Sequence, residues 1–154
     1  MVDTVQLSTG TTVGISATLP TLFNLSTTGY PAQTYVLIGE VMDVPEGGDQ
    51  RTVVPYNPLA SDNEEYLLGS KTHDQVTISI MRDDDDAGQL AVQNAYNAKT
   101  EVALEIEYPD GSIDYFTGFV VSFKSAVGAV NSILARSMTV QRTRSTVTAA
   151  TPSA

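Results

Sequence analysis

Residues 108–123, YPDGSIDYFTGFVVSF, decide the fold. Proline fixes one backbone angle and Asp-Gly suits a tight turn, so Pro109 to Ser112 predict a reversal of the chain. A long apolar run follows the turn. The chain has seven tyrosines and four phenylalanines, and five of these aromatics lie here: Tyr108, Tyr115, Phe116, Phe119 and Phe123. Because one aromatic side chain can bury ~150–250 Å², the stretch predicts a β-hairpin that anchors a core.

The segment before this turn predicts the other strand of the hairpin. In residues 101–108 apolar side chains alternate with Glu101, Glu105 and Glu107. Alternation with a period of two places the two sets on opposite faces of a strand. The same alternation predicts strands at residues 11–19 and 74–81. A near-continuous apolar run predicts a strand covered on both faces at 34–41, and a final strand is predicted at 132–142. One face of the strand at 101–108 is therefore expected to be acidic and in contact with water.

One helix is predicted, at about residues 84–98. Apolar residues recur at helical spacing in AGQLAVQNAYNAK, and four aspartates, Asp83 to Asp86, precede them. Carboxylates suit the positive end of a helix dipole, and one of them can cap the first turn. The order of strands, helix and hairpin-linked strands predicts a mainly β fold. We expect an antiparallel β-sandwich or barrel-like pair of sheets with one flanking α-helix.

The 154 residues are expected to form one domain over residues 1–144, with a flexible C-terminal tail at 145–154. Residues 1–9 are likewise expected to be disordered. A long loop at residues 43–71 is inserted between strands. It is rich in proline and glycine, and only 51–54 and 65–68 suggest short strands within it. A loop of this length is functional or disordered in the free protein.

Composition excludes several classes of function. The net charge is −10, from 18 acidic residues against 8 basic ones, which argues against binding DNA by neutralising phosphate. Cysteine is absent, so disulfides, thiolate metal sites and cysteine nucleophiles are excluded. The sequence has no run of eighteen apolar residues, so it predicts no transmembrane helix. Its first residues do not resemble a signal peptide.

The sequence predicts neither catalysis nor a cofactor. His73 is the only histidine and stands in a predicted turn with no nucleophile motif, so we interpret it as an exposed loop residue. The four consecutive aspartates could hold a hard cation, but they lack the alternating spacing of a calcium loop and suit a helix N-terminus better. No phosphate-binding glycine motif is present.

Residues 108–145 resemble the end of the tube domain of lambda-type phage tail tube proteins. There an aromatic–Pro–Asn/Asp–Gly turn leads to a strand that ends in glycine and an aromatic, followed by a K-A-V loop and a Thr/Val/Arg-rich strand. The matching residues are Tyr108, Pro109, Asp110, Gly111, Gly118, Phe119, Lys124, Ala126, Val127, Thr139, Val140 and Arg144. The insertion of Ser125 departs from the pattern. Residues 145–151, STVTAAT, resemble the junction after that domain.

The resemblance implies a structural virion protein rather than an enzyme. Such proteins form hexameric rings that stack into a hollow tail and guide DNA from capsid to host, and type VI secretion tubes share their fold. It implies contacts with further copies, with the tape measure protein and with tail tip and terminator proteins. DNA passes without specific binding, and no membrane is involved. The expected locations are the virion tail and, during assembly, the host cytoplasm. In lambda an immunoglobulin-like domain follows; here a single-domain relative or a truncated form is expected.

Two sets of residues are candidates for this role. The first comprises apolar residues of the long loop, expected to contact a neighbouring ring: Val53, Val54, Tyr56, Leu59, Tyr66 and Leu67. The second comprises carboxylates expected to line the lumen: Glu101, Glu105, Glu107 and Asp114. The alternatives are a type VI secretion-like tube protein, a monomeric ligand-binding β-sandwich and a carboxylate hydrolase.

Overall fold

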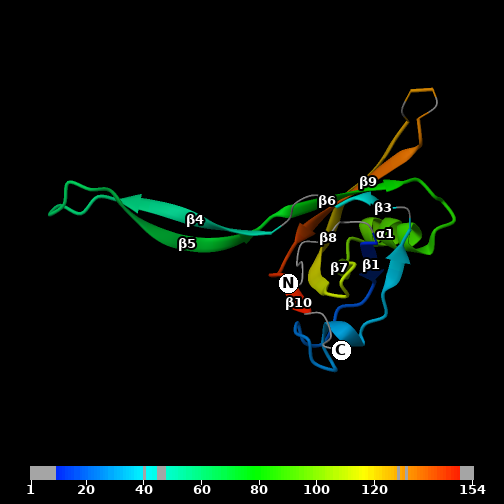
Figure 1. Cartoon of the computed structure of the whole chain (residues 1–154), viewed down its shortest axis with the longest axis horizontal. Coiled ribbons are helices and arrows are strands. Elements are labelled where there is room, and N and C mark those ends of the chain that lie inside the picture. The colour runs from blue at the N-terminus through cyan, green and yellow to red at the C-terminus, as the bar shows by residue number, and fades with distance from the viewer. Residues whose placement is uncertain (1–9, 40, 45–47, 128, 131, 150–154) are drawn as a thin grey trace, which may run out of the picture.

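The computed structural model describes residues 10–39, 41–44, 48–127, 129–130 and 132–149, and within them the chain is mainly β (Figure 1). Eight strands form one main sheet in the order β2-β1-β7-β8-β9-β6-β3, with β10 paired to β8. Strands β4 and β5 form a separate two-stranded sheet. The bounds are β1 Thr12–Ser16, β2 Val36–Ile38, β3 Val41–Asp43, β4 Asp49–Tyr56, β5 Glu65–His73, β6 Gln75–Met81, β7 Glu101–Glu107, β8 Ile113–Ala126, β9 Ala135–Arg142 and β10 Val147–Ala149.

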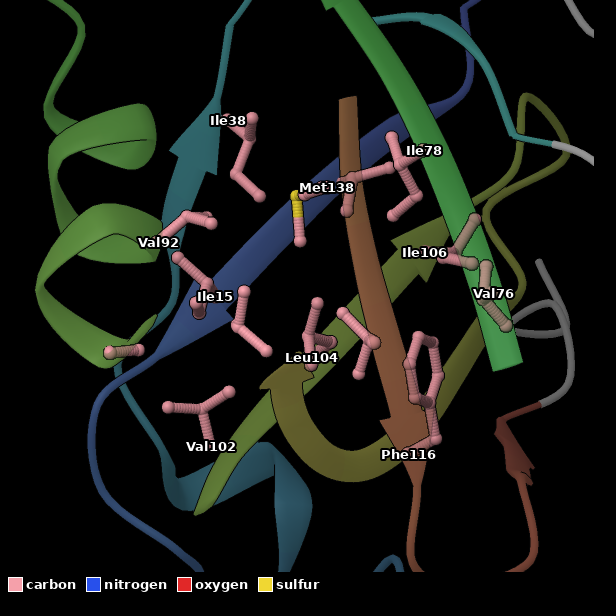
Figure 2. Packing of buried hydrophobic residues seen from close by; sticks show 14 of the residues in the cluster. Ile15, Ile38, Val76, Ile78, Val92, Val102, Leu104, Ile106, Phe116 and Met138 are labelled. Carbon is pink, nitrogen blue, oxygen red and sulfur yellow. The ribbon is translucent and has the colours of Figure 1, made fainter. Parts of the chain in front are cut away.

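The main sheet curls so that its two halves enclose one apolar core. Side chains of β1 and β7 point toward those of β6 and β9, and Figure 2 shows Ile15 and Leu104 in the same cluster as Ile78 and Met138. All four are essentially inaccessible to water. Burying one such side chain contributes about 1.5–3 kcal/mol. The predicted barrel-like, mainly β fold is therefore confirmed, with one curled sheet and one small sheet in place of a pair of similar sheets.

The predicted helix is confirmed as α1 (Ala87–Ala98), which closes one side of the core through Val92. The side chain of Asp86 accepts a hydrogen bond from the backbone N–H of Gln89 and so caps the first turn, as predicted. Asp86 also accepts from the backbone N–H of Gly39, which ties the start of α1 to the end of β2. The helix ends at Lys99, whose φ of 57° is left-handed.

The hairpin of residues 108–123 takes the predicted place, because β8 is paired with β7, β9 and β10. Phe116 enters the core, whereas Tyr115 points to the opposite face of the sheet. There it stacks on Tyr30, with 5.4 Å between ring centroids. Aromatic side chains of β8 therefore pack on both faces of the sheet. Among the aromatic residues of this strand, only Phe119 is exposed.

Three predictions of local structure were wrong. The loop predicted at 43–71 is instead, over residues 49–73, the hairpin formed by β4 and β5, although the short strands suggested at 51–54 and 65–68 lie within these two strands. The strand predicted at 34–41 is divided into β2 and β3. In the tail predicted to be flexible, residues 147–149 form β10. Propensity missed the first and third because hydrogen-bonded pairing with a partner strand outweighs turn-forming composition. The predicted disorder of residues 1–9 and 150–154 lies outside the described residues.

Close approach of α1 to β2 gives a test of this packing. A Cβ atom on Gly88 would lie 2.2 Å from the backbone oxygen of Leu37, which cannot move without shifting β2. We therefore expect Gly88→Ala to lower the free energy of unfolding by about 1–3 kcal/mol, the usual cost of overpacking. Urea denaturation measures it. The matched control is Gly48→Ala, whose new Cβ would meet nothing within 4 Å. Equal stabilities for the two variants would contradict the proposed tight contact.

Candidate functional site

The most prominent surface feature is the hairpin of residues 49–73, which we call the arm. It projects away from the main sheet (Figure 1), and no other element in the described part of the chain packs along its length. Strand β5 continues into β6 with only Asp74 between them. The arm is therefore an extension of a core strand into solvent.

Both faces of the arm are apolar. Val53 is opposite Leu68, and Val54 is opposite Leu67. Residues directly opposite each other share a face and consecutive residues alternate, so each pair occupies a different face. All four side chains are exposed, Leu68 by 72%. An isolated two-stranded ribbon is marginally stable in water, and contiguous exposed apolar surface marks an interaction site.

The six contact residues predicted in this segment all lie on the arm or its tip and all are exposed. They are Val53, Val54, Tyr56, Leu59, Tyr66 and Leu67. Sequence reasoning missed Leu68, although it follows Leu67 directly. The signal was available, because two adjacent leucines in a strand must place one on each face.

A charged network holds the root of the arm. The Asp49 carboxylate accepts from Lys71 Nζ at 2.9 Å and Arg142 NH1 at 3.0 Å, and His73 Nδ1 lies 2.7 Å away. Burial alone would raise the pKa of the Asp49 carboxyl. Hydrogen bonds with His73 and Lys71 and the charge of Arg142 outweigh burial and hold this pKa well below its usual range. The interpretation of His73 as an exposed loop residue was therefore wrong.

The acidic strand is less open than predicted. Glu101 accepts from Arg144 NH1 at 2.5 Å and also from the Thr143 hydroxyl. Glu105 is half-buried; burial, and then the charge of Glu107, raise the pKa of its carboxyl. Only Glu107 of the three glutamates is exposed. The expectation that all three turn to water was wrong, because other parts of the chain cover this face of β7.

A tyrosine cluster provides that cover. Tyr30, Ala103 and Tyr115 are buried together, with Tyr35 and Val147 packed against them. A short 3₁₀ turn, η1 (Tyr30–Ala32), brings Tyr30 onto the face that carries the glutamates. Strand β7 is thus buried on both sides at its centre. Alternation in the sequence identified its inner face but could not show that a distant loop would cover its outer one.

The last of the four lumen candidates, Asp114, takes part in two hydrogen bonds. Its carboxylate accepts from the Tyr108 hydroxyl and from the Thr148 hydroxyl, each at 2.6 Å. Burial, the hydrogen bond to Asp114 and the negative charge of Asp114 together raise the pKa of Tyr108 to about 12. The structure places Asp114 beside β7 opposite Ile106. Directly opposite residues share a face, so Asp114 lies on the core-facing side of the sheet with Ile106, whereas Glu101, Glu105 and Glu107 lie on the other side. The structure therefore does not bring Asp114 together with the three glutamates, of which Glu107 is the most accessible.

Three of the four aspartates before α1 accept local hydrogen bonds or ion pairs, Asp83 from the backbone N–H of Asp85. Asp86 caps the helix, and Asp84 forms ion pairs with Arg82 and Arg136. Among the described residues, no group of three or more His, Asp or Glu side chains is arranged to hold a metal ion. No helix in the described ranges is long and apolar enough to cross a membrane.

Comparison with known proteins identifies solved structures of similar fold. No curated protein matches the chain. A chain from the sheath/tube terminator structure of PVC, an extracellular contractile injection system, is 12% identical with a TM-score of 0.67, covering 97% of this chain and 100% of that one. A chain from the virion of a native gene transfer agent particle is 14% identical with a TM-score of 0.62, covering 90% and 95%.

A chain from the SPP1 tail tube is 13% identical with a TM-score of 0.57, covering 86% of this chain and 72% of that one. At these identities the solved structures show a shared fold. The family model for phage tail tube proteins matches residues 1–151, almost the whole sequence. The chain therefore belongs to the phage tail tube protein family.

Proposed function

We propose that the protein assembles as hexameric rings that stack into a hollow tail tube, and that this tube conducts phage DNA to the host. The observation that carries the proposal is the arm, an ordered hairpin with apolar side chains on both faces and no partner within the described chain. Membership of the tail tube family supplies the context in which further copies cover it. On this proposal the protein is structural and catalyses no reaction.

The arm is proposed to contact the next ring. It lies outside the compact body (Figure 1), so it can reach a neighbour without unfolding. It is anchored to the core strand β6, to which β5 is joined through one residue. Covering Val54 and Leu67 on one face and Val53 and Leu68 on the other would remove the apolar surface that the free protomer exposes.

The lumen is proposed to be anionic, with Glu107 as its most accessible carboxylate and with Glu105 and Glu101 beside it on the same face of β7; Asp114 lies on the opposite face of the sheet. In a six-fold ring one carboxylate becomes six. Phosphate would then meet a wall of its own sign and would not adhere, whereas a basic wall would bind it. Screening limits this repulsion to about 8 Å at physiological salt, so it acts close to the wall.

The proposed partners are further copies of the chain, the tape measure protein and the tail tip and terminator proteins. DNA is proposed to pass without specific binding. The protein would reside in the virion tail, after assembly in the host cytoplasm. A second candidate is a tube of a contractile or type VI secretion-like system, favoured by the similarity to chains of PVC structures, whose tube lies in a sheath. Co-purification of a sheath protein with the tubes would favour this second candidate.

Electron microscopy and sedimentation test the assembly. Concentrating the purified protein should give rings and hollow tubes with six-fold projections. The test variant is Val54→Ser with Leu67→Ser, which removes the apolar surface of one arm face. Each buried side chain contributes about 1.5–3 kcal/mol, and each 1.4 kcal/mol is tenfold in affinity. We therefore expect the critical concentration for tubes to rise by more than about tenfold.

The control for the arm variant is Gln50→Asn with Thr72→Ser, a pair of polar changes on the same arm. Circular dichroism should show that both variants keep the protomer fold. Tubes from the Val54 and Leu67 variant at the normal concentration would contradict the role of the arm. A protomer that stays monomeric at every concentration would contradict assembly itself.

The lumen proposal is tested at Glu107, because changing Glu101 would also break its ion pair with Arg144. Glu107→Lys should leave tube formation unchanged and reduce DNA delivery, since six lysines per ring attract phosphate. Infectivity and DNA ejection of particles that carry the variant measure this. Glu107→Gln separates loss of repulsion from gain of attraction and should have the smaller effect. Unimpaired ejection with Glu107→Lys in normal tubes would show that Glu107 does not face the DNA.

The half-buried Glu105 predicts a pH-dependent stability of the protomer. Its pKa in the folded state lies above the unfolded value of about 4.3. At pH values between these two pKa values, the folded protein therefore binds more protons than the unfolded protein does. The free energy of unfolding consequently falls as the pH rises through this range. Glu105→Gln should be more stable than the natural protein at pH 7, with the difference disappearing below about pH 4. Urea unfolding at both pH values measures it, and Glu64→Gln, on the exposed arm tip, should change neither. A Glu105→Gln variant that is less stable at pH 7 would contradict the assignment.

A further inference from the structure

The geometry at the arm root points to a coupling between the arm and the C-terminal segment that the tube function alone does not require. We propose that Arg142 and Lys71 fix the direction of the arm and couple it to the C-terminal segment, residues 145–149. The coupling is a property of the single protomer. Only its consequence for assembly rests on the proposed function of the arm.

Arg142 is the central residue of this network. It is the last residue of β9 and is 3% exposed. Its NH1 donates to the backbone oxygen of Gly48 at 2.6 Å and to Asp49 Oδ1 at 3.0 Å. These two acceptors stand where β4 begins. The guanidinium also lies 5.7 Å from the centre of the Phe116 ring, which belongs to the core. Arg142 therefore ties the start of the arm to the rigid part of the fold.

The same cations also hold the C-terminal segment. Arg142 NH2 donates to the Thr146 hydroxyl. Lys71 Nζ lies 2.9 Å from Asp49 Oδ2 and donates to the Ser145 hydroxyl at 2.8 Å. Each cation thus contacts the arm root with one donor and the C-terminal segment with another. Immediately after these hydroxyls the chain enters β10, which pairs with the beginning of β8.

The remaining connections of the arm to the body are few. The backbone N–H of Asp74 donates to Gly48 at 3.0 Å, and Gln141 Nε2 donates to the backbone oxygen of His73 at 2.9 Å. Both lie at the junction of β5 and β6 and leave the arm free to pivot about it. Within the described residues, no element packs along the arm to oppose such a pivot. The ion pair of Asp49 with Arg142 and the hydrogen bond from Lys71 to Ser145 supply the opposing constraint.

The chemistry of the network makes the coupling strong. A guanidinium stays charged at all accessible pH values and has a rigid set of donors. Removing one partner of a buried charge leaves the other uncompensated, which is strongly unfavourable. Displacing residues 145–149 therefore breaks the link from Lys71 on the arm to Ser145 and removes the Thr146 hydroxyl, which helps to orient the Arg142 guanidinium beside Asp49. In the assembled tube, a neighbour that displaced β10 would thereby free the arm of the same protomer.

Distance measurements in the free protomer test the proposal. The natural chain has no cysteine, so Asn63→Cys at the arm tip and Asn97→Cys on α1 can each carry a spin label. Double electron–electron resonance, at a concentration where sedimentation shows monomers, then reports the distribution of arm positions. We expect one narrow distance distribution in the otherwise natural chain. Asp49→Asn should at least double its width, and so should Ser145→Ala combined with Thr146→Val.

The control is Arg82→Gln, which breaks an exposed ion pair with Asp84 away from the arm root and should leave the width unchanged. Arg142→Gln carries the risk of unfolding, so Asp49→Asn, at the end of the network, serves as the primary variant. An unchanged width in folded Asp49→Asn protein would overturn the proposal. Broadening with Asp49→Asn but not with the Ser145 and Thr146 variant would overturn the coupling to the C-terminal segment. Because no tube is needed, failure of assembly would not affect these results.

Discussion

The fold depends on the contact between the two halves of the curled sheet. Ile15 and Leu104 from one half meet Ile78 and Met138 from the other, and all are excluded from water. A single sheet that closes on itself needs little else to enclose a core, so one helix is enough to cover the open side. Because the curled sheet and one helix enclose the core, β4 and β5 lie outside it and are available for contacts with other molecules.

The second constraint is that the centre of β7 is buried on both faces. One face joins the main core, and the other carries the buried cluster of Tyr30, Ala103 and Tyr115, against which Tyr35 and Val147 pack. The cost is that a glutamate on the outer face is partly withdrawn from water, which raises the pKa of Glu105. Ion pairing with Arg144 compensates the same withdrawal at Glu101. The three carboxylates of β7 therefore differ in environment: Glu101 is ion-paired, Glu105 is half-buried and Glu107 is exposed.

Much of the fold could be predicted from local patterns, because alternation at 101–107 and 75–81 and the aspartates before α1 act within one element. The acidic strand was only partly predictable, since the cover over Glu101 and Glu105 comes from residues far away in the sequence. The prolines and glycines of the arm predict turns and hence a loop, although Val53, Val54, Leu67 and Leu68 have the composition of a strand. The network of Asp49 and Arg142 could not be predicted, because it joins residues 93 positions apart.

The near-continuity of β5 and β6 has a mechanical consequence. A pull on residues 65–73 along their axis passes through Asp74 directly into β6. Strand β6 is paired with β9 over its whole length, from Gln75 opposite Gln141 to Met81 opposite Ala135. Tension therefore loads these backbone hydrogen bonds together in shear, instead of opening them one at a time from an end. The protruding hairpin is attached in the geometry that best resists being torn from its domain.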